Sequence, residues 1–295
     1  MTEYKALIAG ATRGLQKTVV KGLRAAADII LPRTCAVCGR RLNLDERHLC
    51  LPCLAEIPLT HFWERNHNIM ADRLNQLIES GIDSYLTEGR LERYAFAAAL
   101  FFYDGQGCFR HIPHRLKYQG DISIGKFFGQ MLGRKLAGAN HFKDVDLVIP
   151  VPLHWTRRWK RGYNQAEVIA QEIADGLGCF MRTDILKRRR RTRTQTKVDP
   201  KDKSANVSGA FIARLPQDKT EKFSIDPVCM RKHPNDVYMR GKFHVNNNYG
   251  YRHILLVDDV FTSGSTLHSC FLALRAVFPV EVRISIATLG FVGGA

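Results

Sequence analysis

Short apolar runs and amphipathic stretches alternate over most of the chain. Five runs have the length and composition of buried strands, at residues 95–103, 146–152, 184–187, 253–258 and 280–289. Between them, apolar residues recur at helical spacing at residues 108–118, 122–136, 164–177 and 266–277. Buried strands separated by helices are typical of a parallel sheet covered on both faces, so the sequence predicts an α/β fold.

The first 94 residues do not follow this alternation. Apolar residues at spacings of three and four predict a helix over residues 1–31 that ends at Pro32. This helix could lie on a membrane surface, but its apolar face carries no Phe or Trp, which favours packing against its own domain. We expect an N-terminal helix (1–33), a cysteine-rich module (34–60), a helical connector (61–94) and the α/β domain (95–295).

The hydrophobic pattern also predicts the cellular compartment of the protein. No uncharged apolar run approaches the roughly 20 residues that span a bilayer, so we expect no membrane span. Charged residues interrupt the apolar positions near the N-terminus, so a secretory signal is not expected. The sequence therefore predicts a cytoplasmic protein whose thiols stay reduced. It leaves the oligomeric state open, a homo-oligomer included.

Four cysteines form two CxxC pairs with eleven residues between the pairs. Each pair can bind one side of a tetrahedral ion, and four thiolates suit a structural Zn²⁺ ion ahead of iron. A disulfide pair would need an oxidising compartment, and two thioredoxin-like redox motifs would each need a βαβ context. We therefore predict a zinc site, to which His48 could contribute but is not needed. The expected ligands are Cys35, Cys38, Cys50 and Cys53.

The chain carries 44 Lys and Arg against 28 Asp and Glu, and two segments hold most of the formal charge of +16. Residues 187–203 contain nine Lys or Arg and two Asp, which gives +7, and residues 157–161 add four more basic residues. Such patches are typical of nucleic-acid-binding proteins and of enzymes that hold a polyphosphate, so charge leaves both classes open. The hydrophobic share of 45% is ordinary for a globular protein and excludes wholesale disorder.

The strand expected at residues 253–258 ends in two acids, and a short loop rich in hydroxyls follows. A loop of this kind at a helix N-terminus suits a monophosphate. Asp258 and Asp259 would repel phosphate, but they can accept hydrogen bonds from sugar hydroxyls or assist Mg²⁺ through water. An ordinary capped helix is the weaker interpretation, because adjacent acids there would cost stability. We therefore predict a phosphorylated-sugar site, with the phosphate held by Thr262, Ser263, Gly264, Ser265 and Thr266.

This segment resembles the phosphoribosyl-pyrophosphate (PRPP) motif of type I phosphoribosyltransferases. More of the chain resembles one branch of these proteins, the ComF/GntX family of competence-type proteins. Residues 35–53 match its zinc ribbon, in the version with one ribbon rather than two. Other family motifs occur in the expected order, at residues 115–120, 148–154, 161–165, Gln195 and 206–211. The resemblance runs from about residue 29 to residue 289 with one interruption.

The resemblance implies a PRPP-dependent transferase, a glycosyltransferase that moves a pentosyl group to an acceptor and releases pyrophosphate. Asp258 and Asp259 would hold the ribose 2′- and 3′-hydroxyls, and residues 262–266 the 5′-phosphate. Mg²⁺ would come with PRPP, and residues 191–203 would close over the reacting centre. Neither a catalytic residue nor the acceptor is apparent. The residues expected near the pyrophosphate are Lys117, Arg157, Arg161, Asn164, Arg191 and Lys203.

Two departures and a rival hypothesis accompany this resemblance. Lys203 stands where the family usually has Arg, and a Lys lacks the bidentate fork of a guanidinium. Residues 215–251 form an insertion where relatives have a short turn. The family is tied to natural transformation, so the alternative is a non-catalytic adaptor or single-stranded-DNA-binding protein that uses PRPP as a signal. Trp155 and Trp159 lie among basic residues, as base stacking requires, but they could equally pack on the sheet.

Overall fold

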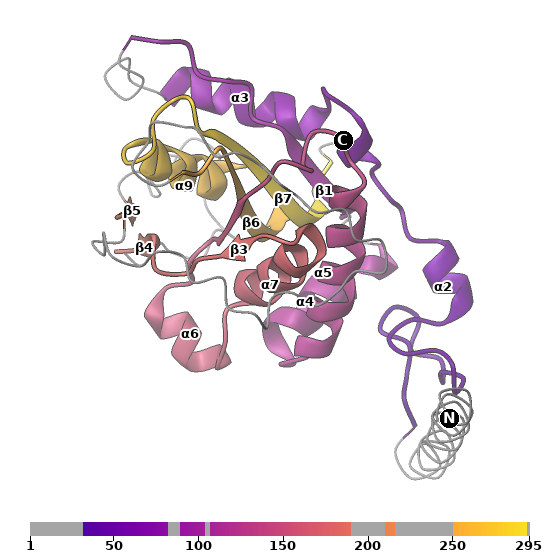
Figure 1. Ribbon diagram of the computed structural model, residues 1–295. Coiled ribbons are helices and arrows are strands. Elements are labelled where there is room, and N and C mark those ends of the chain that lie inside the picture. Colours follow the sequence, from indigo (N-terminus) through magenta and orange to yellow (C-terminus); the bar gives the residue numbers. More distant parts are fainter. Residues whose placement is uncertain (1–31, 82–88, 104–106, 190–209, 216–249, 294–295) are drawn as a thin grey trace, which may run out of the picture.

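The central feature of the structure, a computed structural model, is a five-stranded parallel sheet with the strand order β1-β7-β6-β2-β3 (Figure 1). The strands are β1 (Ala97–Phe102), β2 (Leu147–Pro150), β3 (Phe180–Met181), β6 (His253–Phe261) and β7 (Arg283–Phe291). Helices cover both faces of the sheet, which confirms the predicted α/β fold. The structure describes residues 32–81, 89–103, 107–189, 210–215 and 250–293, so the predicted helix over residues 1–31 lies outside it.

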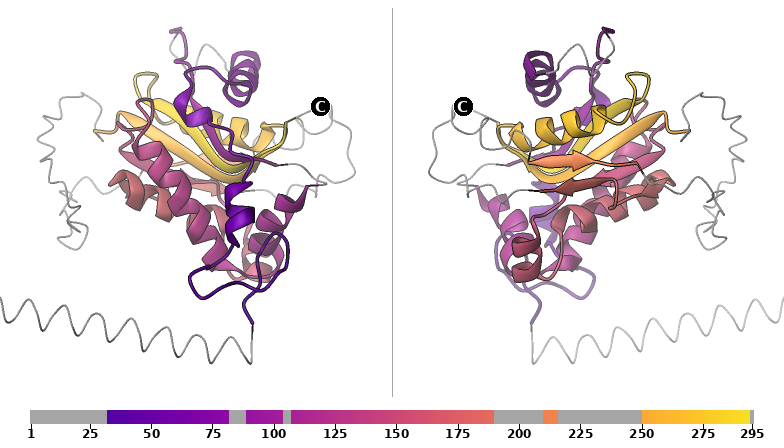
Figure 2. Two further views of the ribbon diagram at one scale, coloured as in Figure 1. Left: turned by 90° about the vertical axis from the view of Figure 1, so that its right-hand side faces the viewer. Right: turned by 90° about the vertical axis from the view of Figure 1, so that its left-hand side faces the viewer.

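The side views show helices against both faces of the sheet (Figure 2). The α5 (Ile122–Ala137) and α7 (Gln165–Leu177) helices pack on one face, and α3 (Ile69–Gly81) and α9 (Ser265–Arg275) on the other. The remaining short helices are α2 (Leu51–Ala55), η1 (Phe62–Glu64), η3 (Cys108–Arg110), α4 (His111–Tyr118) and α6 (Trp155–Arg161). None of the helices in these segments is long and apolar enough to cross a membrane.

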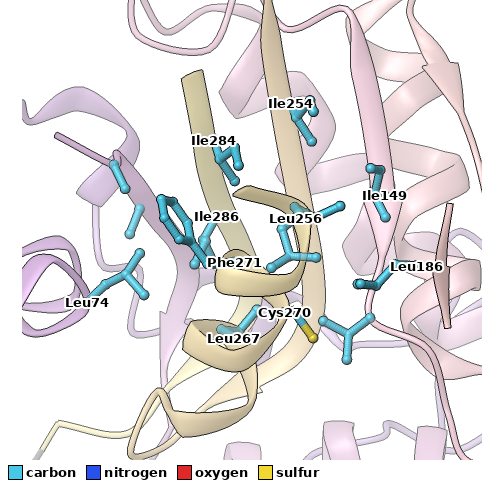
Figure 3. Close-up of a cluster of buried hydrophobic side chains, with 14 of the residues drawn as sticks. Leu74, Ile149, Leu186, Ile254, Leu256, Leu267, Cys270, Phe271, Ile284 and Ile286 are labelled. Carbon is cyan, nitrogen blue, oxygen red and sulfur yellow. The ribbon is translucent and has the colours of Figure 1, made fainter. Parts of the chain in front are cut away.

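Alternate residues of the central strands supply the two halves of the core. Ile254 and Leu256 belong to the buried cluster on the α9 side of the sheet, which also contains Phe271 and Cys270 (Figure 3). Leu255 of the same strand belongs to the cluster on the α5 and α7 side. Such two-sided burial explains why β6 begins as an uninterrupted apolar run, the pattern from which it was predicted.

The strands that follow β2 and β6 in the chain are added toward opposite edges of the sheet. From β2 the chain passes through α7 to β3 at one edge, whereas from β6 it passes through α9 to β7 on the other side. Right-handed crossovers in opposite directions place their helices on opposite faces, as observed. The strand order therefore reverses between β2 and β6, and open α/β sheets bind ligands beyond the carboxyl ends of such strands.

Three predictions about elements need correction. The strand expected at residues 184–187 does not join the parallel sheet, because β4 (Leu186–Arg188) pairs antiparallel with β5 (Phe211–Ala213) in a separate two-stranded sheet. The sequence pattern missed α6, because this helix is short, none of its residues is buried, and its two tryptophans lie among basic residues. It also ended β6 three residues early, since the strand continues to pair with β7 as far as Phe261.

Candidate functional site

Asp258 and Asp259 lie in β6 immediately beyond the last residue that pairs with β2. Pro150 is the β2 partner of Val257, and the amide of Val151 donates to the Val257 carbonyl at 2.8 Å. The acids therefore lie where β2 has ended and the strand order reverses. A ligand can approach them there, because the neighbouring strand no longer covers that side of β6.

The two carboxyl groups differ in their surroundings. Asp259 is buried, and one of its oxygens, Oδ2, lies 2.7 Å from Nζ of Lys117 on α4. Asp258 accepts a hydrogen bond from the backbone N–H of Asp259 at 2.9 Å. Burial and the adjacent charge of Asp259 raise the pKa of Asp258 to about 7, against the opposing effect of Lys117. The site thus holds one ion pair, between Lys117 and Asp259, and one carboxyl group whose pKa is raised to near neutral.

Lys117 stays charged in this environment. Burial acts to lower its pKa, but the charges of Asp259 and Asp258 outweigh burial and hold the pKa of the ammonium above its ordinary value. The sequence placed Lys117 in the pyrophosphate region, and its contact with Asp259 is an additional feature that the sequence did not predict.

Arg188 of β4 also acts on the acid pair, and it in turn lies near Arg157 of α6. Burial, followed by the charge of Arg157, lowers the pKa of Arg188, whereas Asp258 raises it, so Arg188 lies within electrostatic range of both. The Arg188 guanidinium also packs over the ring of Phe211, 5.1 Å from its centroid. Arg188 was not among the predicted site residues, although the run of basic residues that begins at Lys187 could have pointed to it.

Arg161 and Asn164 are held by neighbours within the fold. Arg161 donates to Oε1 of Gln165 at 2.9 Å and covers the ring of Tyr118 at 5.3 Å. Asn164 caps α7 by accepting from the amide of Ala166, and its Nδ2 donates to the Val151 carbonyl at 3.0 Å. Asn164 therefore fastens the end of β2 to the start of α7, which gives it a structural role.

The hydroxyl loop begins after β6 and leads into α9. Thr262 and Ser263 are exposed, and the Ser263 and Ser265 hydroxyls lie 3.0 Å apart. Gly264 has φ +79°, and a Cβ there would lie 2.7 Å from the ring of Phe261. The fold thus requires glycine at this position for its backbone conformation and for packing, in addition to any approach of an anion.

Two predicted site residues, Arg191 and Lys203, lie outside the described residues, as does most of the insertion at 215–251. The basic segment at 190–209 is flanked by β4 and β5, which pair with each other. The amide of Arg189 donates to the Ala210 carbonyl at 2.8 Å, so the two described ends of this segment lie side by side. The basic segment therefore leaves and rejoins the described structure beside Arg188.

The four predicted zinc ligands form a cluster in the N-terminal module. The sulfur atoms of Cys35, Cys38, Cys50 and Cys53 all lie within 4.8 Å of one another. The Cys38 and Cys50 sulfurs are 3.7 Å apart, close to the roughly 3.8 Å edge of a zinc–thiolate tetrahedron. Burial acts to raise the pKa of Cys35, but backbone N–H groups of Cys38, Cys50 and Val37 lower it to about 6, which favours a thiolate.

The cysteine cluster thus fits a zinc ion, and the module that carries it packs against α5. His48 is not part of the cluster; its ring packs 5.2 Å from the ring of Phe127 on α5. This contact joins the cysteine-rich module to the α5 side of the sheet.

No protein-family model matches the chain. The chain is similar to competence protein F of Haemophilus influenzae, with 28% identity over 173 residues, 58% of this chain and 63% of that protein. It is also similar to DNA utilization protein YhgH of Salmonella typhi, with 26% identity over 53% of this chain and 56% of that protein. The similarity therefore spans less than two thirds of the length of these relatives. These similarities agree with the resemblance to the ComF/GntX family that the ordered motifs indicate.

Proposed function

We propose that this protein binds PRPP at Asp258 and Asp259 and transfers its phosphoribosyl group to an acceptor, with release of pyrophosphate. The observation that carries this proposal is the acid pair at the reversal of strand order, with the hydroxyl loop of α9 following it. Lys117 and Arg188 act on the same acids. Acidic and basic groups in one site suit a ligand that combines sugar hydroxyls with phosphates.

The chemistry needs positioning and charge stabilisation more than acid–base groups. The bond between C1 of the ribose and the pyrophosphate oxygen breaks, its electron pair leaves with pyrophosphate, and a lone pair of the acceptor forms the new bond to C1. Asp258 and Asp259 would orient the ribose through its hydroxyls, and nearby cationic groups would stabilise the departing pyrophosphate. Mg²⁺ bound to PRPP would supply further neutralisation of the leaving group.

The biological setting follows from the relatives. Their names refer to competence and DNA utilization, and we propose that this protein likewise serves the uptake or use of DNA. The acceptor could then belong to nucleic-acid metabolism, and screening must decide which class it is.

Binding of PRPP tests the site before the acceptor is known. We expect millimolar PRPP with Mg²⁺ to raise the thermal unfolding midpoint, because a ligand that binds only the folded state stabilises it. The double variant Asp258→Asn with Asp259→Asn should lose this response, whereas Asp175→Asn, on the exposed side of α7, should retain it. A wild-type protein that PRPP does not stabilise would refute the proposal. Pyrophosphate release, screened against bases, amines and DNA ends, then tests turnover.

A second candidate function rests on the exposed face of α6. Trp155 and Trp159 are 72% and 87% exposed, so neither packs on the sheet. Arg158 and Lys160 on the same helix are exposed as well. Exposed aromatic rings among cations suit the stacking of single-stranded bases. Salt-dependent binding of a single-stranded oligonucleotide, weakened in a Trp155→Ala, Trp159→Ala variant that still responds to PRPP, would support it, and unchanged binding would exclude this surface.

A further inference from the structure

Lys117 extends from α4 to the acid pair on β6. The 2.7 Å separation of its Nζ from Oδ2 of Asp259 joins α4 to β6, two elements far apart in the sequence. Both side chains are mostly shielded from solvent, with 29% and 11% of their surfaces exposed. Water therefore screens this ion pair less than it screens an ion pair on the surface.

The residues on both sides of Lys117 contact the end of α6 and the loop that follows it. The Tyr163 hydroxyl donates to the carbonyl of Leu116, and Leu116 itself is buried. The Arg161 guanidinium covers the ring of Tyr118. These contacts hold the last turn of α4, so any adjustment at this point falls to the flexible four-carbon stem of Lys117.

A sugar that binds at the acid pair must compete with this ammonium. The Asp259 oxygen that Lys117 contacts is one of the acceptors that a ribose hydroxyl would use, and the proposed ligand also carries a pyrophosphate that seeks cations. We propose that Lys117 is an exchangeable counter-ion: the ribose takes its place at Asp259, and the released ammonium binds the pyrophosphate of the same ligand. This inference rests on the proposed function and adds a basis for substrate selection to it.

The exchange would favour PRPP over a sugar phosphate without pyrophosphate. Separating Lys117 from Asp259 leaves two partly buried charges without partners, and neutral hydroxyls compensate only the carboxylate. A ligand with pyrophosphate gives the ammonium a new anionic partner, whereas ribose 5-phosphate gives it none. Lys117 would therefore assist PRPP and oppose ribose 5-phosphate, although both ligands use the same acids.

Calorimetric titration of the full chain with each of the two ligands, in the presence of Mg²⁺, tests the exchange. In Lys117→Met, we expect PRPP affinity to fall by about tenfold or more, because a charged contact to phosphate is lost. Ribose 5-phosphate should bind equally well or more tightly, because no ion pair has to be broken. Lys126→Met, an exposed position on α5, serves as the matched control and should leave both affinities unchanged.

Each other outcome has a defined meaning. Equal loss for both ligands would show that Lys117 only positions the acids, and unchanged PRPP affinity would show that it does not reach pyrophosphate; either result overturns the exchange while the proposed function stands. Failure of the wild-type protein to bind PRPP would overturn the proposed function and the exchange with it. If the Met variant is unfolded, Lys117→Gln, which can still donate to Asp259, provides the same comparison.

Discussion

Asp258 should lower the stability of the folded protein at neutral pH, and Asp258→Asn should remove this cost. The Asn side chain keeps an oxygen that can accept the hydrogen bond that the backbone N–H of Asp259 donates to Asp258 Oδ1 at 2.9 Å in the wild-type protein. Burial and the charge of Asp259 raise the pKa of Asp258 to about 7, whereas the unfolded chain has the ordinary value of 3.8. The folded state therefore keeps a proton that the unfolded chain releases, and this group makes stability fall as the pH rises from about 4 to 7.

The size of the effect follows from the two pKa values. At 1.36 kcal/mol per pKa unit, the difference corresponds to roughly 4 kcal/mol above pH 7 as an upper limit. Asp258 is partly exposed, and water screens its charge, so we expect about 2 kcal/mol. Urea unfolding without ligand at pH 5 and pH 8 measures it. The stability of Asp258→Asn relative to wild type should be greater at pH 8 than at pH 5 by about 1 kcal/mol, because the part of the effect that develops between pH 3.8 and pH 5 is already present at the lower pH.

Two further variants control the interpretation. Asp175→Asn changes an exposed carboxylate on α7 and should show no such dependence on pH. Asp259→Asn should destabilise the protein at neutral pH, because it leaves the Lys117 ammonium without its carboxylate partner. A difference between Asp258→Asn and wild type that is the same at pH 5 and pH 8 would refute the reasoning, since Asp258 would then titrate as an ordinary carboxyl group.

Three other substitutions test the zinc cluster, the loop and a buried ion pair. Cys35→Ser should reduce bound zinc to well below one per chain by elemental analysis and lower the unfolding midpoint, and normal zinc content would contradict the cluster. Gly264→Ala should cost about 1–3 kcal/mol by urea unfolding, more than Gly120→Ala, which has a similar positive φ but open space around it. Arg275→Met should cost about 3–5 kcal/mol, because it leaves the buried carboxylate of Glu92 unpaired; a loss below 1 kcal/mol would show that this pair contributes little.

The sequence predicted the elements whose apolar residues are buried, and it failed where burial is slight. The strand at His253–Phe261 begins with a continuous apolar run and the helix at Gln165–Leu177 has apolar residues at helical spacing, and in both elements these residues are buried. By contrast, Trp155–Arg161 forms a helix without a buried residue, so no period marks it. The sequence predicted a strand near Leu186–Arg188 but not the strand with which it pairs, because that partner, Phe211–Ala213, is distant in the sequence.

The candidate site divides in the same way. Asp258, Asp259 and the hydroxyl loop are consecutive, so their joint presence at a strand end was readable from local sequence alone. Lys117 and Arg188 approach the same acids from α4 and β4, and only the folded topology brings them there. Their basic character was visible in the sequence, but their distances from the acids were not.

The cysteine cluster and the acid pair are connected through packing. A zinc ion held by four cysteines has no open position for a substrate, so its effect on function must pass through the protein. Cys35 and Leu49 belong to the same buried cluster as Phe128 of α5 and Leu116 of α4, and Leu116 immediately precedes Lys117. Removal of the metal should therefore loosen the packing of α4, which carries Lys117, and weaken PRPP binding. No cysteine of the cluster lies in the acid-pair site itself.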